Sequence, residues 1–184
     1  MKNLITISAP SGSGKTTLCR QLQKNRNDIE WSVSYTTREK RITESDGRDY
    51  NFITKEQFED LILSEALAEW ENVHGYYYGT SKATLDTAIK DKVTLLLELD
   101  VKGSMSLKKL YPEHAFTIFI LPPSIDHLRN RLRQRGTDSE KRIKIRLKRF
   151  QQEMKYKHRF DFVMVNDNLE IASQELIQTV NDLK

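Results

Sequence analysis

The chain is poor in cysteine, proline and glycine, and no stretch of it is apolar for long. It has 184 residues, with one cysteine, four prolines and seven glycines. A single cysteine excludes an internal disulfide framework. No apolar run approaches the roughly 20 residues that cross a bilayer, which excludes an ordinary membrane-spanning helix. There is also no internal repeat, low-complexity tract or long linker.

Charged residues are abundant, and both signs are present. They make up 30% of the chain against 38% hydrophobic residues, and the net charge is +4 with a pI of about 9.1. This balance predicts a soluble protein with one compact domain. The first residues lack the small-residue cleavage site of a signal peptide, so we expect a cytoplasmic protein.

The basic residues concentrate at 38–48 and 129–159. On charge alone they allow nucleic-acid binding. No stacking platform or nucleic-acid motif supports that interpretation. We therefore expect both clusters to face nucleotide phosphates, with neither nucleic acid nor a membrane as a partner.

Four apolar runs are typical of buried strands: Leu4–Ser8, Val93–Leu99, Phe116–Leu121 and Phe160–Val165. Runs this continuous indicate a parallel sheet that is covered on both faces. Helical apolar stripes centred on Leu128 and Leu147 lie between the third and fourth runs, and one centred on Leu176 follows the fourth. This alternation predicts a doubly wound α/β domain.

The pattern changes between residues 33 and 82, where short aromatic or alternating segments predict a small mixed sheet. Within it, Thr54 and Gln57 form a capping-box pattern for a helix over residues 55–64. Residues 133–146 carry a glycine-containing turn between arginine-rich helices, which predicts a mobile lid. The expected core is then 1–32, 83–132 and 147–184, with the subdomain at 33–82.

A phosphate-binding loop is the strongest motif in the chain. Ser8-Ala9-Pro10-Ser11-Gly12-Ser13-Gly14 follows an apolar run and leads into Lys15-Thr16-Thr17 and a helical pattern. A strand, a glycine-containing loop, Lys-Thr and a helix form the context of a P-loop. Loop N–H groups and the helix N-terminus attract phosphate. Lys15 can reach the β- and γ-phosphates, and the Thr16 hydroxyl can bind Mg²⁺.

The loop departs from the usual pattern at its first position, where Ala9 replaces glycine. A Cβ is tolerable there if the backbone keeps a negative φ. Gly12 and Gly14 remain at the positions where the backbone approaches phosphate. A chance Ser/Gly turn between a strand and a helix is the alternative interpretation.

Two further clusters predict recognition of a second nucleotide. Arg38 and Arg41 follow a short strand, and Tyr50 comes nine residues later; guanidinium groups bind phosphate bidentately. Taken alone, these residues also fit a solvated charged hairpin. Glu69 lies in a strand-like segment, and a carboxylate suits guanine, which presents N1–H and N2–H side by side. Adenine lacks that pair of donors, so a buried carboxylate discriminates against it.

In order along the chain, the P-loop, S-x-T-T-R-x-x-R, D-Y-x-F, E-W, G-x-Y-Y-G and a lid R-G-T segment are present. With these motifs at familiar spacing, the chain resembles the guanylate kinase family from Ile5 to about Ile177. The resemblance implies an enzyme that moves a phosphoryl group from Mg·ATP to GMP or dGMP, with a P-loop NTPase-type parallel sheet, a small GMP-binding subdomain and a helical lid.

The resemblance also implies roles for individual residues. The guanine edge is read by Ser34, Glu69 and Thr80, and the GMP phosphate is held by Arg38, Arg41, Tyr50 and Tyr78. The ATP phosphates are held by Ala9, Pro10, Ser11, Gly12, Ser13, Gly14, Lys15, Thr16 and Thr17. The catalytic cations are Lys15, Arg38, Arg131, Arg135 and Arg146. Asp100, which ends a hydrophobic strand in the Walker-B manner, positions Mg²⁺ with Thr16.

Glu98 stands where the family usually has aspartate, so its contact on the GMP side is in question. Two other functions stay open: a non-catalytic guanylate-kinase-like protein-binding module, and a kinase for another small phosphorylated molecule. Lys15, Thr16 and Asp100 favour catalysis, and Glu69 with Ser34 favours guanine. We expect a monomer or a homodimer.

Overall fold

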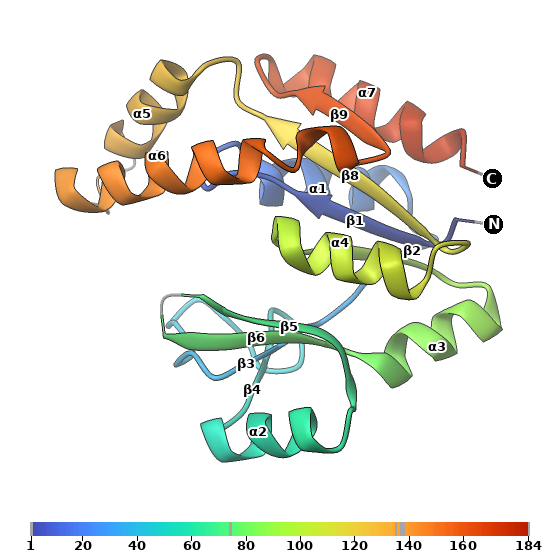
Figure 1. Cartoon of the computed structure of the whole chain (residues 1–184). Helices are drawn as coiled ribbons and strands as arrows, with labels where there is room; N and C mark the ends of the chain where they lie inside the picture. Colours follow the sequence, from blue (N-terminus) through green and yellow to red (C-terminus); the bar gives the residue numbers. More distant parts are fainter. Residues whose placement is uncertain (1, 74, 135, 137–138, 184) are drawn as a thin grey trace.

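The structure is a computed structural model of the chain, and it describes residues 2–73, 75–134, 136 and 139–183. Its larger layer is a parallel sheet in the order β2-β7-β1-β8-β9 (Figure 1). The strands of this sheet are β1 (Leu4–Ser8), β2 (Ile29–Trp31), β7 (Thr94–Glu98), β8 (Ala115–Leu121) and β9 (Phe162–Val165).

Helices cover both faces of the parallel sheet, as the continuous apolar runs predict. On one face lie α1 (Lys15–Asn25) and α7 (Leu169–Asn181), and on the other lie α3 (Lys82–Asp91) and α4 (Val101–Leu110). Helices α5 (Ile125–Gln134) and α6 (Glu140–Met154) pack on each other through an apolar cluster of their own, and a short 3₁₀ turn η1 (Lys157–Arg159) follows α6. Alternate strand residues face opposite sides. Ile5 packs with α1 and α7, whereas Leu4 packs with α3 and α4.

A second, smaller sheet lies apart from the first (Figure 1). Its order is β4-β3-β6-β5, with β3 (Tyr35–Thr36), β4 (Asn51–Phe52), β5 (Leu67–Val73) and β6 (Tyr76–Ser81). The β3–β4 pair is parallel and the others are antiparallel, so the sheet is mixed as predicted. Helix α2 (Lys55–Leu63) packs on it through Phe58, which is fully buried and stacks on Tyr77.

Most sequence predictions of the fold are confirmed, with small shifts at the ends of elements. The first strand has the predicted bounds, and the capping box of Thr54 and Gln57 is complete. The last strand begins at Phe162 rather than Phe160, because the 3₁₀ turn η1 comes directly before Phe160 and Asp161 donates its N–H to Thr117. Strand β2 and helices α3 and α4 were not predicted. The division into core, subdomain and lid remains a prediction.

The pairing of β1 with β7 places the predicted P-loop close to Asp100. The two strands are parallel, with Ile7 opposite Glu98. Their carboxyl ends therefore lie at one edge of the sheet, where ligands bind in open α/β folds. The loop at 9–14 follows β1, and Asp100 follows β7. The smaller sheet lies near the same edge because its strand β5 packs against α4.

Candidate active site

The loop between β1 and α1 has the backbone of an anion-binding turn. Gly12 and Gly14 adopt positive φ values of 94° and 85°, a region that favours glycine. Ser13 donates its N–H to the Pro10 carbonyl at 3.0 Å, which closes the turn. Gly14 is the N-cap of α1, so the helix N-terminus points its free N–H groups into the loop.

Ala9 at the first loop position fits the backbone. Among the described residues, the only non-glycine residues with positive φ are Glu65 and Lys92. Ala9 therefore has the negative φ that alanine requires, and it packs against the core of the sheet. The departure from glycine does not distort the loop.

Asn166, which directly follows β9, holds this loop through a hydrogen bond. Its Nδ2 donates to the Ser13 carbonyl at 2.8 Å, and a Cβ at Gly14 would lie only 2.4 Å from the same nitrogen. Gly14 is thus required by contact as well as by φ. No role for Asn166 was predicted, and its one sequence signal is its position directly after the predicted strand Phe160–Val165.

A cleft of about 590 Å³ opens beside the loop. Its lining includes the loop residues Ala9, Pro10, Ser11, Gly12, Gly14, Lys15, Thr16 and Thr17. Arg131 and Arg146 also line it; Arg131 donates to the Asn166 carbonyl at 3.2 Å, and Arg146 is hydrogen-bonded to the Ser11 hydroxyl of the loop. Arg135, which was predicted to join them, lies outside the described residues.

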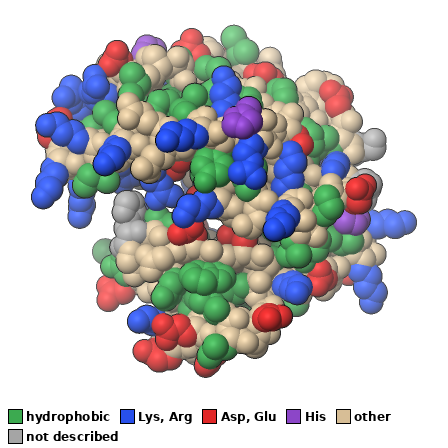
Figure 2. All heavy atoms as spheres, in the orientation of Figure 1, with side chains coloured by type: hydrophobic (Ala, Val, Ile, Leu, Met, Phe, Trp, Pro, Cys, Tyr) green, Lys and Arg blue, Asp and Glu red, His purple; other side chains and the backbone are tan. Residues whose placement is uncertain are grey.

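Lys and Arg side chains gather on the part of the surface that α5 and α6 occupy in Figure 1, as Figure 2 shows. This placement agrees with the predicted basic cluster at 129–159. Several of these cations lie over the cleft, where they raise the local positive potential and favour an anionic ligand.

Glu98 and Asp100 stand across from the loop, and they differ in their contacts. The Thr16 hydroxyl donates to Glu98 Oε2 at 3.2 Å, and Lys15 Nζ lies 3.8 Å from the same oxygen. The other oxygen, Oε1, is buried without a hydrogen-bond partner. Asp100 caps α4, accepting from the Gly103 N–H at 2.8 Å. Glu98, rather than Asp100, is the acid in contact with Thr16.

A smaller hollow of about 220 Å³ adjoins this edge. Of the residues predicted to bind the second nucleotide, it is lined by Ser34, Tyr50, Glu69, Tyr78 and Glu98. Thr80 is buried behind it and donates its hydroxyl to Glu69 Oε1 at 2.5 Å. Glu69 and Thr80 face each other across β5 and β6, so the strand register sets this contact.

Two groups in the hollow have shifted pKa values. Burial, with like charge from Asp100 and Glu71, raises the pKa of Glu69 to about 7, against a lowering by the Thr80 hydrogen bond. Burial, with the charge of Glu98, raises the pKa of Tyr50 to about 12, so its hydroxyl remains a donor. The hollow therefore offers an acid that changes charge near neutral pH.

Gly103 makes room for this carboxyl group. A Cβ on Gly103 would lie 2.6 Å from Glu69 Oε2, well inside van der Waals contact. Gly103 lies in α4. Glycine destabilises a helix interior more than any other residue except proline. Close approach of Glu69 thus explains a glycine that the helix itself does not favour. Gly103 was not predicted, because the contact joins α4 to strand β5, a separate segment of the chain.

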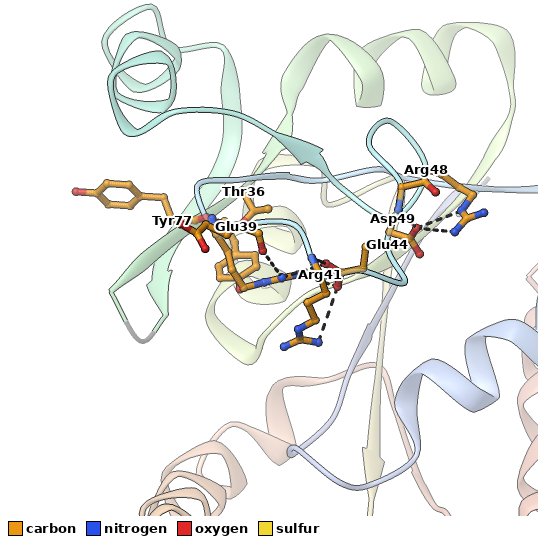
Figure 3. A network of polar contacts seen from close by, with 10 residues as sticks. Thr36, Glu39, Arg41, Glu44, Arg48, Asp49 and Tyr77 are labelled. Carbon is orange, nitrogen blue, oxygen red and sulfur yellow. Dashed lines mark hydrogen bonds and ion pairs between the residues drawn. The ribbon is translucent and has the colours of Figure 1, made fainter. Parts of the chain in front are cut away.

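Arg38 and Arg41 do not line the hollow. Arg38 forms a two-pronged ion pair with Glu44, at 2.8 and 3.0 Å, and donates to the Tyr78 hydroxyl at 3.3 Å. Hydrogen bonding from Arg38 lowers the pKa of Glu44, which therefore stays ionised. Arg41 is exposed and lies 3.8 Å from Glu44 (Figure 3). The Glu44 carboxylate thus binds the two arginines at the place where a phosphate was predicted.

A sequence model of the family described as guanylate kinase matches residues 1–183. The chain belongs to the guanylate kinase family. Curated relatives support this: a guanylate kinase of Carboxydothermus hydrogenoformans is 43% identical over 183 residues, covering 98% of this chain and 89% of the relative. One of Neisseria gonorrhoeae is 46% identical over 179 residues, covering 97% and 87%.

A solved structure agrees with the sequence matches. The crystal structure of guanylate kinase from Anaplasma phagocytophilum superposes with a TM-score of 0.80 at 28% identity, covering 98% of this chain and 85% of that one. The known activity of the family is phosphoryl transfer from ATP to GMP. The resemblance read from the motifs is confirmed.

Gly103→Ala tests the close approach of Glu69. Alanine stabilises a helix interior by about 1 kcal/mol relative to glycine, so α4 itself gains. The added methyl displaces Glu69, and we expect KM for GMP to rise about tenfold while KM for ATP changes little. Steady-state kinetics measure both constants. Ser106→Ala, at an exposed position of the same helix, is the control. An unchanged KM for GMP in Gly103→Ala contradicts the assignment.

Proposed function

We propose that this chain transfers the γ-phosphoryl group of ATP to GMP or dGMP, giving ADP and GDP. One observation carries the proposal. The cleft beside the P-loop and the hollow beside Glu69 share Lys15 and Asp100 in their walls. Two nucleotides bound in these spaces meet with their phosphates together, which is the geometry that direct transfer requires.

On the donor side, the loop from Ala9 to Thr17 binds the ATP phosphates. The N–H groups at the start of α1 point to the phosphates, and Lys15 adds a positive charge next to them. Arg131 and Arg146, which line the same cleft, contact the phosphates from α5 and α6, and Arg135 joins them in the proposal. Together they neutralise the charge of the transferring group.

On the acceptor side, Glu69 reads guanine. Its ionised carboxylate accepts N1–H and N2–H, with Ser34 and Thr80 completing the site. The Tyr50 and Tyr78 hydroxyls donate to the GMP phosphate, and Arg38 and Arg41 turn to it from Glu44. The phosphate replaces Glu44 as the anionic partner of Arg38, so this guanidinium stays paired in the complex.

Mg²⁺ is the metal that this donor set suits. Thr16, Glu98 and Asp100 supply hard oxygen ligands, and Glu98 Oε1 is buried without a partner. Among the described residues no three acidic, histidine or cysteine side chains form a complete metal cage. Mg²⁺ commonly binds through one or two carboxylates plus substrate phosphates. When bound, it neutralises charge on the phosphates.

The reaction requires no general base. The attacking atom is an oxygen of the GMP phosphate, which is already ionised at neutral pH. Positioning and electrostatic stabilisation supply the catalysis. We also propose that the subdomain at 33–82 and the lid at 133–146 close over the bound pair and exclude water, which otherwise accepts the phosphoryl group.

Location and partners complete the proposal. Among the described residues, every helix is too short or too polar to cross a bilayer. We propose that the protein acts in the cytoplasm on free nucleotides, without a nucleic-acid partner, as a monomer or homodimer.

Glu69→Gln tests the reading of guanine. Glutamine keeps the size of the side chain but replaces one acceptor with a donor. We expect KM for GMP to rise about 10- to 100-fold, the 1–3 kcal/mol of a bidentate base contact, with a matching loss of preference over AMP. Coupled assays with both acceptors measure this. Glu56→Gln, exposed on α2, is the control. Full selectivity in Glu69→Gln disproves this assignment.

The pH dependence of GMP use tests the charge of Glu69. GMP binds the carboxylate form, and the pKa in the free protein is about 7. Because the protonated fraction grows as the pH falls, we expect kcat/KM for GMP to be constant above pH 8 and to fall about tenfold per unit below about 7.

The GMP phosphate also titrates, so Glu69→Gln serves as the reference at each pH. The ratio of wild-type to variant kcat/KM isolates the Glu69 contribution, because glutamine does not titrate. A ratio that stays constant between pH 6 and 8 contradicts the assignment.

Lys15→Ala tests the P-loop. The loop backbone needs no lysine to form, so we expect an unchanged thermal unfolding temperature and a loss of kcat of at least about 10²–10³-fold. Lys24→Ala, exposed at the far end of α1, keeps wild-type turnover. Comparable turnover in a folded Lys15→Ala variant rejects the P-loop assignment.

A further inference from the structure

Arg149, on α6, lies in the wall between the two nucleotide spaces. The cleft beside the P-loop and the hollow beside Glu69 have four lining residues in common: Lys15, Val73, Asp100 and Arg149. A phosphoryl group that passes from one space to the other crosses this wall. Lys15 and Arg149 are its cations within the described part of the chain.

Two carboxylates hold the Arg149 side chain from different elements. Its Nε donates to Glu153 Oε1 at 2.8 Å, one turn further along α6, and its Nη2 donates to Asp100 Oδ2 at 3.2 Å. Glu153 is only 8% exposed, and burial raises its pKa while Arg149 opposes the shift. The guanidinium is therefore oriented before any ligand arrives.

The bonding leaves this guanidinium able to bind phosphate. An arginine has five N–H donors in a fixed fork, and the two bonds to Glu153 and Asp100 use two of them. The side chain is 35% exposed, so it faces the open spaces rather than the packed core. A purely structural link between α6 and the N-cap of α4 would not require Arg149 to line both spaces, as it does.

We infer that Arg149 is a further catalytic residue, which contacts the γ-phosphoryl group as it moves between the nucleotides. This inference rests on the proposed function. In the transfer, the bond from the γ-phosphorus to the oxygen it shares with ADP breaks, and a bond to a GMP phosphate oxygen forms. The leaving electron pair stays on ADP, and no proton is needed. Arg149 stabilises the charge on the equatorial oxygens during the step.

Substitution of Arg149 gives the first test. In Arg149→Gln we expect kcat to fall about 10²–10³-fold, the usual effect of removing one transition-state donor, while KM for ATP and GMP stays within about threefold. Arg149→Lys restores part of the loss, because lysine keeps the charge without the fork. Lys109→Gln removes an exposed charge from the last turn of α4, outside both nucleotide spaces, and keeps wild-type kcat.

A binding measurement separates catalysis from a structural tie. Aluminium fluoride with ADP and GMP mimics the transferring group. By calorimetry, Arg149→Gln should weaken binding of this complex by about the same factor as kcat, yet bind GMP alone as the wild type does. Wild-type kcat in Arg149→Gln overturns the inference. So does an equal loss of GMP binding with a lowered unfolding temperature. Wild-type protein that fails to phosphorylate GMP instead rejects the proposed function.

Discussion

The parallel pairing of β1 with β7 is the constraint on which the site depends. It places Ile7 opposite Glu98, so the P-loop and the acidic end of β7 leave the sheet at one edge. This pairing alone brings Thr16 and Lys15 into contact with Glu98. A shift of this register by one residue would turn every side chain of the shifted strand to the other face and separate these groups.

The second sheet depends on the same edge through α4. The helix begins at Val101, with Asp100 as its N-cap two residues after β7, and it places Gly103 against the Glu69 side chain of β5. A missing side chain on one element thus admits a charged side chain from another. The proposed guanine-binding hollow and the proposed phosphate-binding cleft are consequently linked through α4, and Arg149 lines both.

The sequence predicts features that follow from local patterns. Continuous apolar runs identify the parallel strands, and the spacing of Gly12, Gly14 and Lys15 identifies the loop. β2 was missed because it is three residues long and carries Glu30 and a partly exposed Trp31, so no apolar run marks it. Helices are likewise hard to read where glycine and serine interrupt the apolar stripe, as in α4.

The contacts that complete the site join segments distant in sequence, so no local pattern reports them. Asn166 reaches Ser13 across 153 positions, and Arg149 reaches Asp100 across 49. Arg38 shows the converse: its motif suggests a phosphate ligand, but in the structure Glu44 holds it. A sequence motif predicts which ligand a side chain can bind, but it does not predict which residue pairs with that side chain before the ligand binds.

The central claim is that two nucleotides meet at the edge formed by β1 and β7. A crystal structure with one molecule that joins adenosine and guanosine through a polyphosphate chain tests it most directly. The account predicts phosphates on the loop N–H groups and Lys15, and guanine N1 and N2 within about 3 Å of the Glu69 carboxylate, an ordinary hydrogen-bond distance. Guanine bound away from Glu69, or a loop without phosphate, would contradict it.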